Sequence, residues 1–96
     1  MLQFVIIAKD GTDPDALDRR MTARPFHIET AKKLKEENHF IVSGATLDKE
    51  GKMIGSVMLV QFETEEDLKL WLEKDPYVTG DVWKDIVIKP FRVAEV

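Results

Sequence analysis

Residues 40–62, FIVSGATLDKEGKMIGSVMLVQF, contain the hairpin around which the rest of the fold can be assembled. Residues 40–45 and 53–62 are rich in side chains that are typical of strands. The polar stretch DKEGK at 48–52 separates the two runs and has the composition of a turn. We therefore predict two consecutive antiparallel strands.

Two further strands are expected near the ends of the sequence. Residues 2–9 (LQFVIIAK) carry apolar side chains at odd and even positions, so this strand should be covered on both faces. Residues 83–93 (WKDIVIKPFRV) form the last candidate strand. Proline has no N–H to donate within a sheet, so Pro90 indicates an edge strand or a bulge.

A short helix is predicted between the hairpin and the last strand. Thr64 with Asp67 resembles a capping box, in which the first residue accepts a hydrogen bond from the backbone N–H of the second. The helix should end near Lys74, because Asp75 precedes Pro76 and a residue before proline avoids helical angles. The side chains expected on its buried side are Leu68, Trp71 and Leu72.

A longer helix is predicted to begin at Pro14, with Asp13 as the N-cap candidate. Pro25 interrupts the pattern, because proline removes a backbone donor and crowds the preceding turn. We expect either a kink or two abutting helices, 14–23 and 25–37. The apolar positions that follow the helical spacing are Leu17, Met21, Ile28, Ala31 and Leu34.

The predicted order of elements, β-α-β-β-α-β, indicates a single α+β domain spanning residues 1–96. This order is typical of the ferredoxin-like sandwich, in which a four-stranded antiparallel sheet has both helices on one face. The other face also carries apolar side chains, and 44% of all residues are hydrophobic. We therefore expect a homodimer in which a second subunit covers that face.

Composition argues against several kinds of partner and compartment. The net charge is −4, and no basic stripe exists to neutralise nucleic-acid phosphates. No apolar run is long enough for a membrane span or a secretory signal, so we expect a cytoplasmic protein that does not bind membranes. Because the sequence contains no cysteine, thiolate catalysis and disulfides are excluded.

Motifs for cofactors and metals are missing from the sequence. It contains no G-x-G-x-x-G, P-loop or H-E-x-x-H pattern, and its two histidines are twelve residues apart. We expect neither a cofactor nor a metal site. Ser43 and Ser56 lack the surroundings of a nucleophile elbow, which argues against a serine hydrolase.

His27 is the most informative polar residue of the long helix. At about 100° per residue it points between the directions of Ala31 and Leu34, so its ring should face the sheet. Such a histidine is either a core residue that orients the helix or a general acid and base. His39 lies in the turn after the helix and is given no functional role.

Several charged residues near His27 are open to two interpretations. Asp75 either caps the turn at Pro76 or belongs to a site. Arg24 precedes His27 by three residues and could bind an anion with two parallel hydrogen bonds. Arg19 and Arg20 are expected to form a solvated basic face.

Several segments resemble one known family in the right order. Residues 24–27 (RPFH) resemble the R-P-x-H segment of YciI-like, or YCII-related, domains, and residues 75–77 (DPY) resemble the D-P-[YF] corner of that family. Weaker likenesses lie at residues 43–44, 51–56 and 88–91.

This resemblance implies a dimeric α+β barrel built from two ferredoxin-like subunits. It also implies a small-molecule pocket between helix and sheet, in which His27 transfers a proton and Asp75 orients it and stabilises the imidazolium. One related enzyme eliminates HCl from a chlorinated hydroxyhydroquinone. The residues expected to bind substrate are Arg24, Ser43, Ser56 and Tyr77.

Our leading hypothesis is a cofactor-independent lyase, similar to a dehydrochlorinase, or an isomerase acting on a small polar or aromatic molecule. The alternative is a non-catalytic dimeric protein that binds a small molecule or acts as an accessory subunit. A purely structural dimer would have no cavity beside His27.

Overall fold

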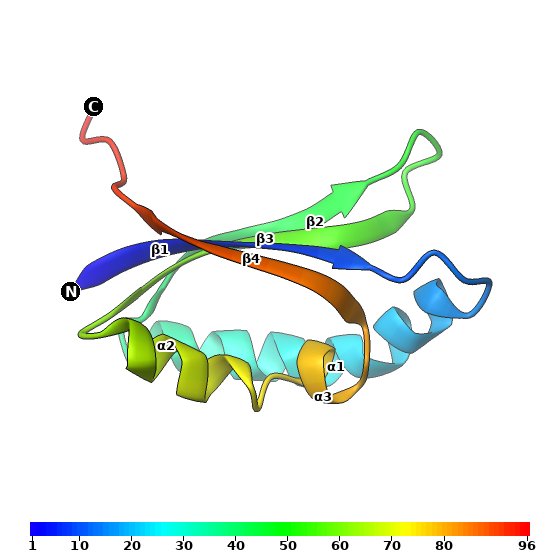
Figure 1. Ribbon diagram of the computed structural model, residues 1–96, viewed down its shortest axis with the longest axis horizontal. Helices are drawn as coiled ribbons and strands as arrows, with labels where there is room; N and C mark the ends of the chain where they lie inside the picture. The colour runs from blue at the N-terminus through cyan, green and yellow to red at the C-terminus, as the bar shows by residue number, and fades with distance from the viewer.

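The computed structural model describes residues 1–96. Four strands form one antiparallel sheet in the order β2-β3-β1-β4, as in Figure 1. This arrangement confirms the predicted ferredoxin-like α+β fold, and β4, which contains Pro90, is an edge strand as expected. The strands are β1 (Leu2–Asp10), β2 (Phe40–Leu47), β3 (Met53–Phe62) and β4 (Trp83–Phe91).

Three helices cover one face of this sheet and leave the other face open, as Figure 1 shows. They are α1 (Ala16–Glu36), α2 (Glu65–Leu72) and the single turn α3 (Pro76–Thr79). The core lies between the two layers. Its largest fully buried hydrophobic side chains are Tyr77, Ile6, Leu34, Met58, Leu68, Val60 and Val82. None of the helices is both long enough and apolar enough to cross a membrane.

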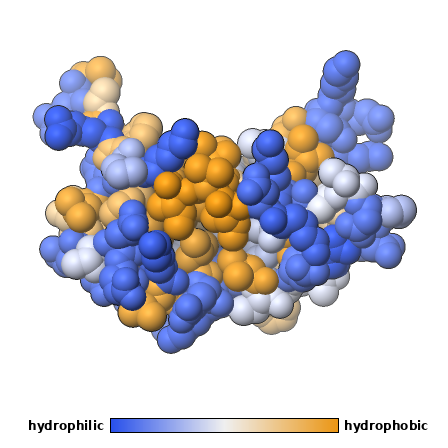
Figure 2. Space-filling model, viewed as in Figure 1, coloured by the Kyte–Doolittle hydropathy of each residue, from blue (hydrophilic) through white to orange (hydrophobic).

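Alternate residues of the central strands face opposite sides of the sheet. Ile6 pairs with Met58, and both side chains are fully buried under the helices. The next residue, Ile7, pairs with Val57 and Val87 on the opposite side and is 38% exposed. Figure 2 shows apolar side chains gathered between the two raised ends of the molecule. We call this side the open face; its apolar residues are Val5, Ile7, Val42, Val57, Leu59, Val87 and Phe91.

Helix α1 is one helix, so of the two predicted alternatives, a kink or two abutting helices, the second is wrong. Pro25 lies inside it, and the helix is held on the sheet by buried residues on both sides of the proline, Ala23 and His27. Packing therefore outweighs the loss of one backbone hydrogen bond. The start also differs from the prediction, because Asp13 binds Arg19 through two hydrogen bonds of 2.7 and 2.8 Å instead of capping the helix.

The buried stripe of α1 differs from the apolar pattern of the sequence. Met21, expected to face the sheet, is 49% exposed. Its neighbour Arg20 is buried instead, because Asp10 on β1 neutralises its charge. The buried side of the helix consists of Ala16, Arg20, Ala23, His27 and Leu34.

Local chemistry explains the second half of the fold well. The Thr64 hydroxyl accepts a hydrogen bond of 3.1 Å from the Asp67 N–H, which confirms the predicted cap of α2. Gly55 allows β3 to approach its neighbours closely, because a Cβ atom there would lie 2.5 Å from the Ala8 carbonyl oxygen and 2.6 Å from the Thr46 hydroxyl. The chain therefore reaches the next residue, Ser56, without steric strain.

Candidate functional site

His27 and Asp75 meet under the sheet, although they are far apart in the sequence. His27 Nδ1 lies 2.8 Å from Asp75 Oδ2 and 3.1 Å from Oδ1. A carboxylate only accepts hydrogen bonds, so the neutral ring donates from Nδ1 and leaves a lone pair on Nε2. His27 is 5% exposed and Asp75 is completely buried, so water competes little for this contact.

The DPY corner positions the carboxylate. Asp75 has an extended backbone conformation and is the N-cap of α3, with Pro76 in the first turn. Its Oδ2 atom accepts a second hydrogen bond of 3.0 Å, from the Tyr77 N–H. The capping geometry and the contact with His27 therefore occur in the same side chain, so the two interpretations of Asp75 do not exclude each other.

Tyr77 lies between His27 and Arg20. Its ring stacks on His27 with 3.9 Å between centroids and an interplanar angle of 13°. The Arg20 guanidinium lies over the Tyr77 ring, 4.7 Å from its centroid. Burial raises the pKa of Tyr77, and the nearby charges of Arg20 and Arg24 oppose this shift only in part. The phenol is therefore neutral at physiological pH.

The expectation of a solvated face is wrong for Arg20, which lies beside His27 in the interior. It is 2% exposed and its Nη1 atom lies 3.0 Å from both carboxylate oxygens of Asp10. Its Nη2 atom donates to the Ser56 hydroxyl at 2.8 Å. The spacing between Arg20 and His27 could have predicted that Arg20 is buried, because seven residues are about two helical turns and place both side chains on one face.

One nitrogen of the Arg20 guanidinium is enclosed and has no partner. Its Nε atom is the only fully enclosed side-chain nitrogen or oxygen without a hydrogen-bond partner. Such an atom costs about 1–3 kcal/mol. His27 Nε2 also has no partner within the protein, and since it is not among the enclosed atoms, it must be accessible from a cavity.

That cavity has a volume of about 130 Å³ and lies between α1 and the strands β2 and β3. All four residues expected to bind substrate line it, and Arg24 has no ion-pair partner there. A purely structural dimer would lack this cavity. The complete lining is Arg20, Arg24, His27, Ile28, Ser43, Gly44, Ala45, Ser56, Met58 and Tyr77.

The remaining candidates lie elsewhere. The hydrogen bond from Arg19 lowers the pKa of Asp13, which is exposed and precedes α1, and neither residue lines the cavity. His39 Nδ1 lies 2.8 Å from the Gln61 carbonyl oxygen, and its ring stacks on Phe62. No three His, Asp or Glu side chains come together in a way that could hold a metal ion.

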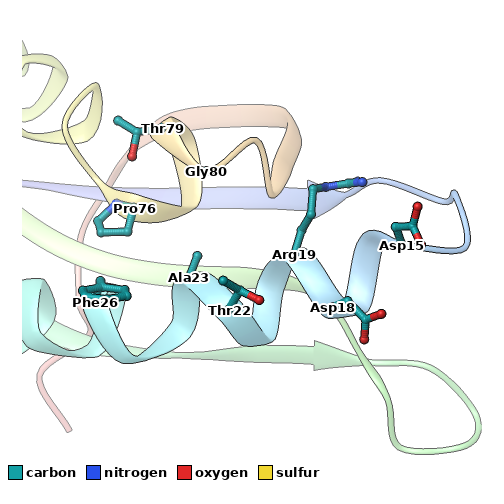
Figure 3. A pocket seen from close by; sticks show the side chains of 9 residues that line it. All are labelled: Asp15, Asp18, Arg19, Thr22, Ala23, Phe26, Pro76, Thr79 and Gly80. Carbon is teal, nitrogen blue, oxygen red and sulfur yellow. The ribbon is translucent and has the colours of Figure 1, made fainter.

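A larger hollow of about 690 Å³ lies on the outer side of the helices, between α1 and α3. Figure 3 shows Phe26 and Pro76 at one end and charged side chains at the other. Of these, Arg19 already binds Asp13, and none of the residues expected to form a site lines this hollow. The smaller cavity contains His27, which can transfer a proton, and the unpaired guanidinium of Arg24, which can bind an anion.

Known proteins resemble this chain in sequence and in fold. The chain is 30% identical to Protein YciI of Escherichia coli O6:H1, covering 93% of this chain and 95% of that protein. The solved structure of 5-chloro-2-hydroxyhydroquinone dehydrochlorinase (TftG) from Burkholderia phenoliruptrix AC1100, in complex with 2,5-dihydroxybenzoquinone, has a TM-score of 0.82 at 22% identity, covering 96% and 95%. A dimeric ferredoxin-like protein of unknown function from Jannaschia sp. CCS1 has a TM-score of 0.57 at 12% identity, covering 97% and 100%.

The two structural likenesses agree with the observed fold. The family is shown by the sequence itself, because the match to the YCII-related domain extends over residues 2–92 and includes both the RPFH and the DPY segments. The resemblance inferred from these segments is confirmed, and the chain belongs to the YCII-related domain family.

Proposed function

We propose that this protein is a cofactor-independent lyase or isomerase in which His27 transfers a proton on a small polar or aromatic molecule. The observation that carries the proposal is the dyad: buried Asp75 binds Nδ1, so that Nε2 is free and accessible from the cavity. A histidine held in this way is suited to general acid and base catalysis.

The geometry supports a simple sequence of steps. Nε2 takes a proton from a substrate carbon, and the electron pair moves to a neighbouring carbonyl oxygen. Asp75, 2.8 Å from Nδ1, stabilises the imidazolium that forms. When His27 returns the proton to another atom of the substrate, the product is an isomer. In an elimination, the electron pair returns from the oxygen and expels an anionic leaving group from the adjacent carbon, and the proton held by His27 leaves with that anion.

The volume of the cavity and the unpaired charge of Arg24 limit the class of substrate. An apolar cavity of about 150 Å³ is known to hold one benzene molecule, so a cavity of about 130 Å³ fits one small ring or a short chain. Arg20 is neutralised by Asp10, but the Arg24 guanidinium has no carboxylate beside it. A negatively charged substrate would supply the missing partner. TftG, whose substrate and bound ligand each contain a single ring, supports the same size.

The proposed enzyme is a homodimer in which two open faces pack together. The open face exposes Val42 by 53% and Phe91 by 44%, besides Ile7 and Val87 near its centre. A contiguous apolar sheet face is costly in water and is normally covered. The dimeric state of the similar protein from Jannaschia sp. CCS1 supports a second copy as the cover.

Proton transfer can be tested before the product is known. The protein is incubated in heavy water with a panel of small keto acids, hydroxy acids and phenols, and exchange of carbon-bound hydrogen is followed by proton NMR. We expect exchange in at least one compound and a loss of about 100-fold or more in His27→Ala. His39→Ala is the matched control, because it removes the other histidine outside the cavity.

Asp75→Asn tests the dyad separately. Oδ2 accepts from the Tyr77 N–H and is also the atom closest to His27 Nδ1, so the asparagine oxygen would take its place and keep both hydrogen bonds. The substitution removes the negative charge that stabilises the imidazolium, so exchange should fall while binding persists. Binding of panel compounds without exchange by the wild type would favour the non-catalytic alternative. Full exchange activity in His27→Ala would exclude His27 from the mechanism.

A further inference from the structure

The Ser56 hydroxyl is surrounded by donors. Its Oγ atom accepts a hydrogen bond of 2.8 Å from Arg20 Nη2 and one of 3.2 Å from Trp83 Nε1. A guanidinium and an indole N–H only donate, whereas a serine hydroxyl has one hydrogen and two acceptor sites. Both acceptor sites are therefore occupied, and the hydroxyl hydrogen has no acceptor within the protein.

The place of Ser56 limits where that hydrogen can point. Ser56 is 4% exposed and lines the cavity that also contains His27. Its neighbours across the sheet, Ala8 and Ala45, have only a methyl group and offer no side-chain acceptor. The acceptor for this hydrogen must come from a molecule in the cavity.

We infer that Ser56 is a hydrogen-bond donor of fixed direction that binds the substrate oxygen on which negative charge develops. This inference rests on the proposed function and names a feature of its substrate: a carbonyl, enol or phenol oxygen close to the carbon that loses its proton. When Nε2 takes that proton, the electron pair moves to the oxygen, and the Ser56 O–H donates to it more strongly. Ser56 keeps its own proton throughout.

Arg20 acts through Ser56 as a positioning residue. The two contacts with Asp10 hold the guanidinium, and its Nη2 atom then occupies one lone pair of the hydroxyl. The Nη2–H donor at 2.8 Å also polarises the O–H bond toward the cavity. This role accounts for a buried arginine in a cavity where its charge is already neutralised by a carboxylate.

The direction of the hydroxyl can be observed without any ligand. In a neutron structure of the deuterated protein, the Ser56 deuterium should point into the cavity, and both Arg20 and Trp83 should donate to Oγ. A deuterium directed at a protein atom would overturn the inference.

The preference for an oxyanion is tested with 4-nitrophenol, a single-ring probe that ionises near neutral pH and changes its absorbance on ionisation. We expect the wild type to bind the phenolate about 10-fold or more tightly than Ser56→Ala does. Ser56→Thr, which keeps the hydroxyl, should restore most of the affinity. Thr30→Val removes a hydroxyl bonded to the Phe26 carbonyl outside the cavity and should leave the affinity unchanged.

If Ser56→Ala does not fold, Ser56→Cys keeps a similar size with a weaker donor and should show the same direction of change. Equal phenolate affinity in the wild type and the Ser56 variants, or no binding to the wild type, would overturn the inference. The probe measures binding alone, so a loss of affinity without any proton exchange on the substrate panel would support the Ser56 donor and count against acid and base catalysis by His27.

Discussion

At the residue scale, the buried phenol of Tyr77 makes stability depend on alkaline pH. Burial raises the Tyr77 pKa above its ordinary value of 10.0, so the contribution to stability is present below pH 10.0 and is lost as pH rises toward the higher folded value. Between about pH 8 and about pH 11, the free energy of unfolding should fall less in Tyr77→Phe than in the wild type. Urea denaturation at each pH measures it. Tyr77 is the only tyrosine, so tyrosinate absorbance reports it directly. Equal losses in both proteins would contradict a shifted pKa.

At the element scale, α1 tolerates Pro25 because tertiary packing holds both of its halves on the sheet. Pro25→Ala restores a backbone donor in an exposed position, so we expect the free energy of unfolding to rise by about 1–3 kcal/mol. Chemical denaturation measures the change, with Thr22→Ala on the same helix as the control. A less stable Pro25→Ala protein would indicate that proline restricts the unfolded chain more than it weakens the helix.

At the scale of the whole molecule, the open face should decide the oligomeric state. Ile7 lies at its centre, paired with Val57 and Val87, so Ile7→Glu would bury a charge between two sheets and should give monomers at micromolar concentration. Met21→Glu is the matched control, because Met21 is similarly exposed but lies on α1. Light scattering measures the mass, and a wild-type protein that is monomeric under these conditions would contradict the dimer.

The elements could be read from the sequence wherever local chemistry decides. The turn at 48–52, the cap of α2 at Thr64 and the corner at Asp75 depend on neighbouring residues, and the structure contains all three. Alternation along β1 predicted that both faces of the sheet are apolar, and the position of His27 within its helix predicted its burial. The prediction was poorest for α1. Local rules end a helix at Pro25 and bury Met21, but tertiary packing keeps Pro25 inside the helix and leaves Met21 exposed.

By itself, the sequence determined the order of the elements, the sheet with two apolar faces, the burial of His27 and the family, because periodicity, turn chemistry and short motifs are local properties. The family resemblance named most of the candidate site residues, but only the tertiary structure decided how they meet and that Arg20 joins them. Asp75 is 48 residues from His27, and the Ser56 hydroxyl is 36 residues from Arg20. Arg20 could be buried only because Asp10, on another element, neutralises it, and no local pattern records such a partner.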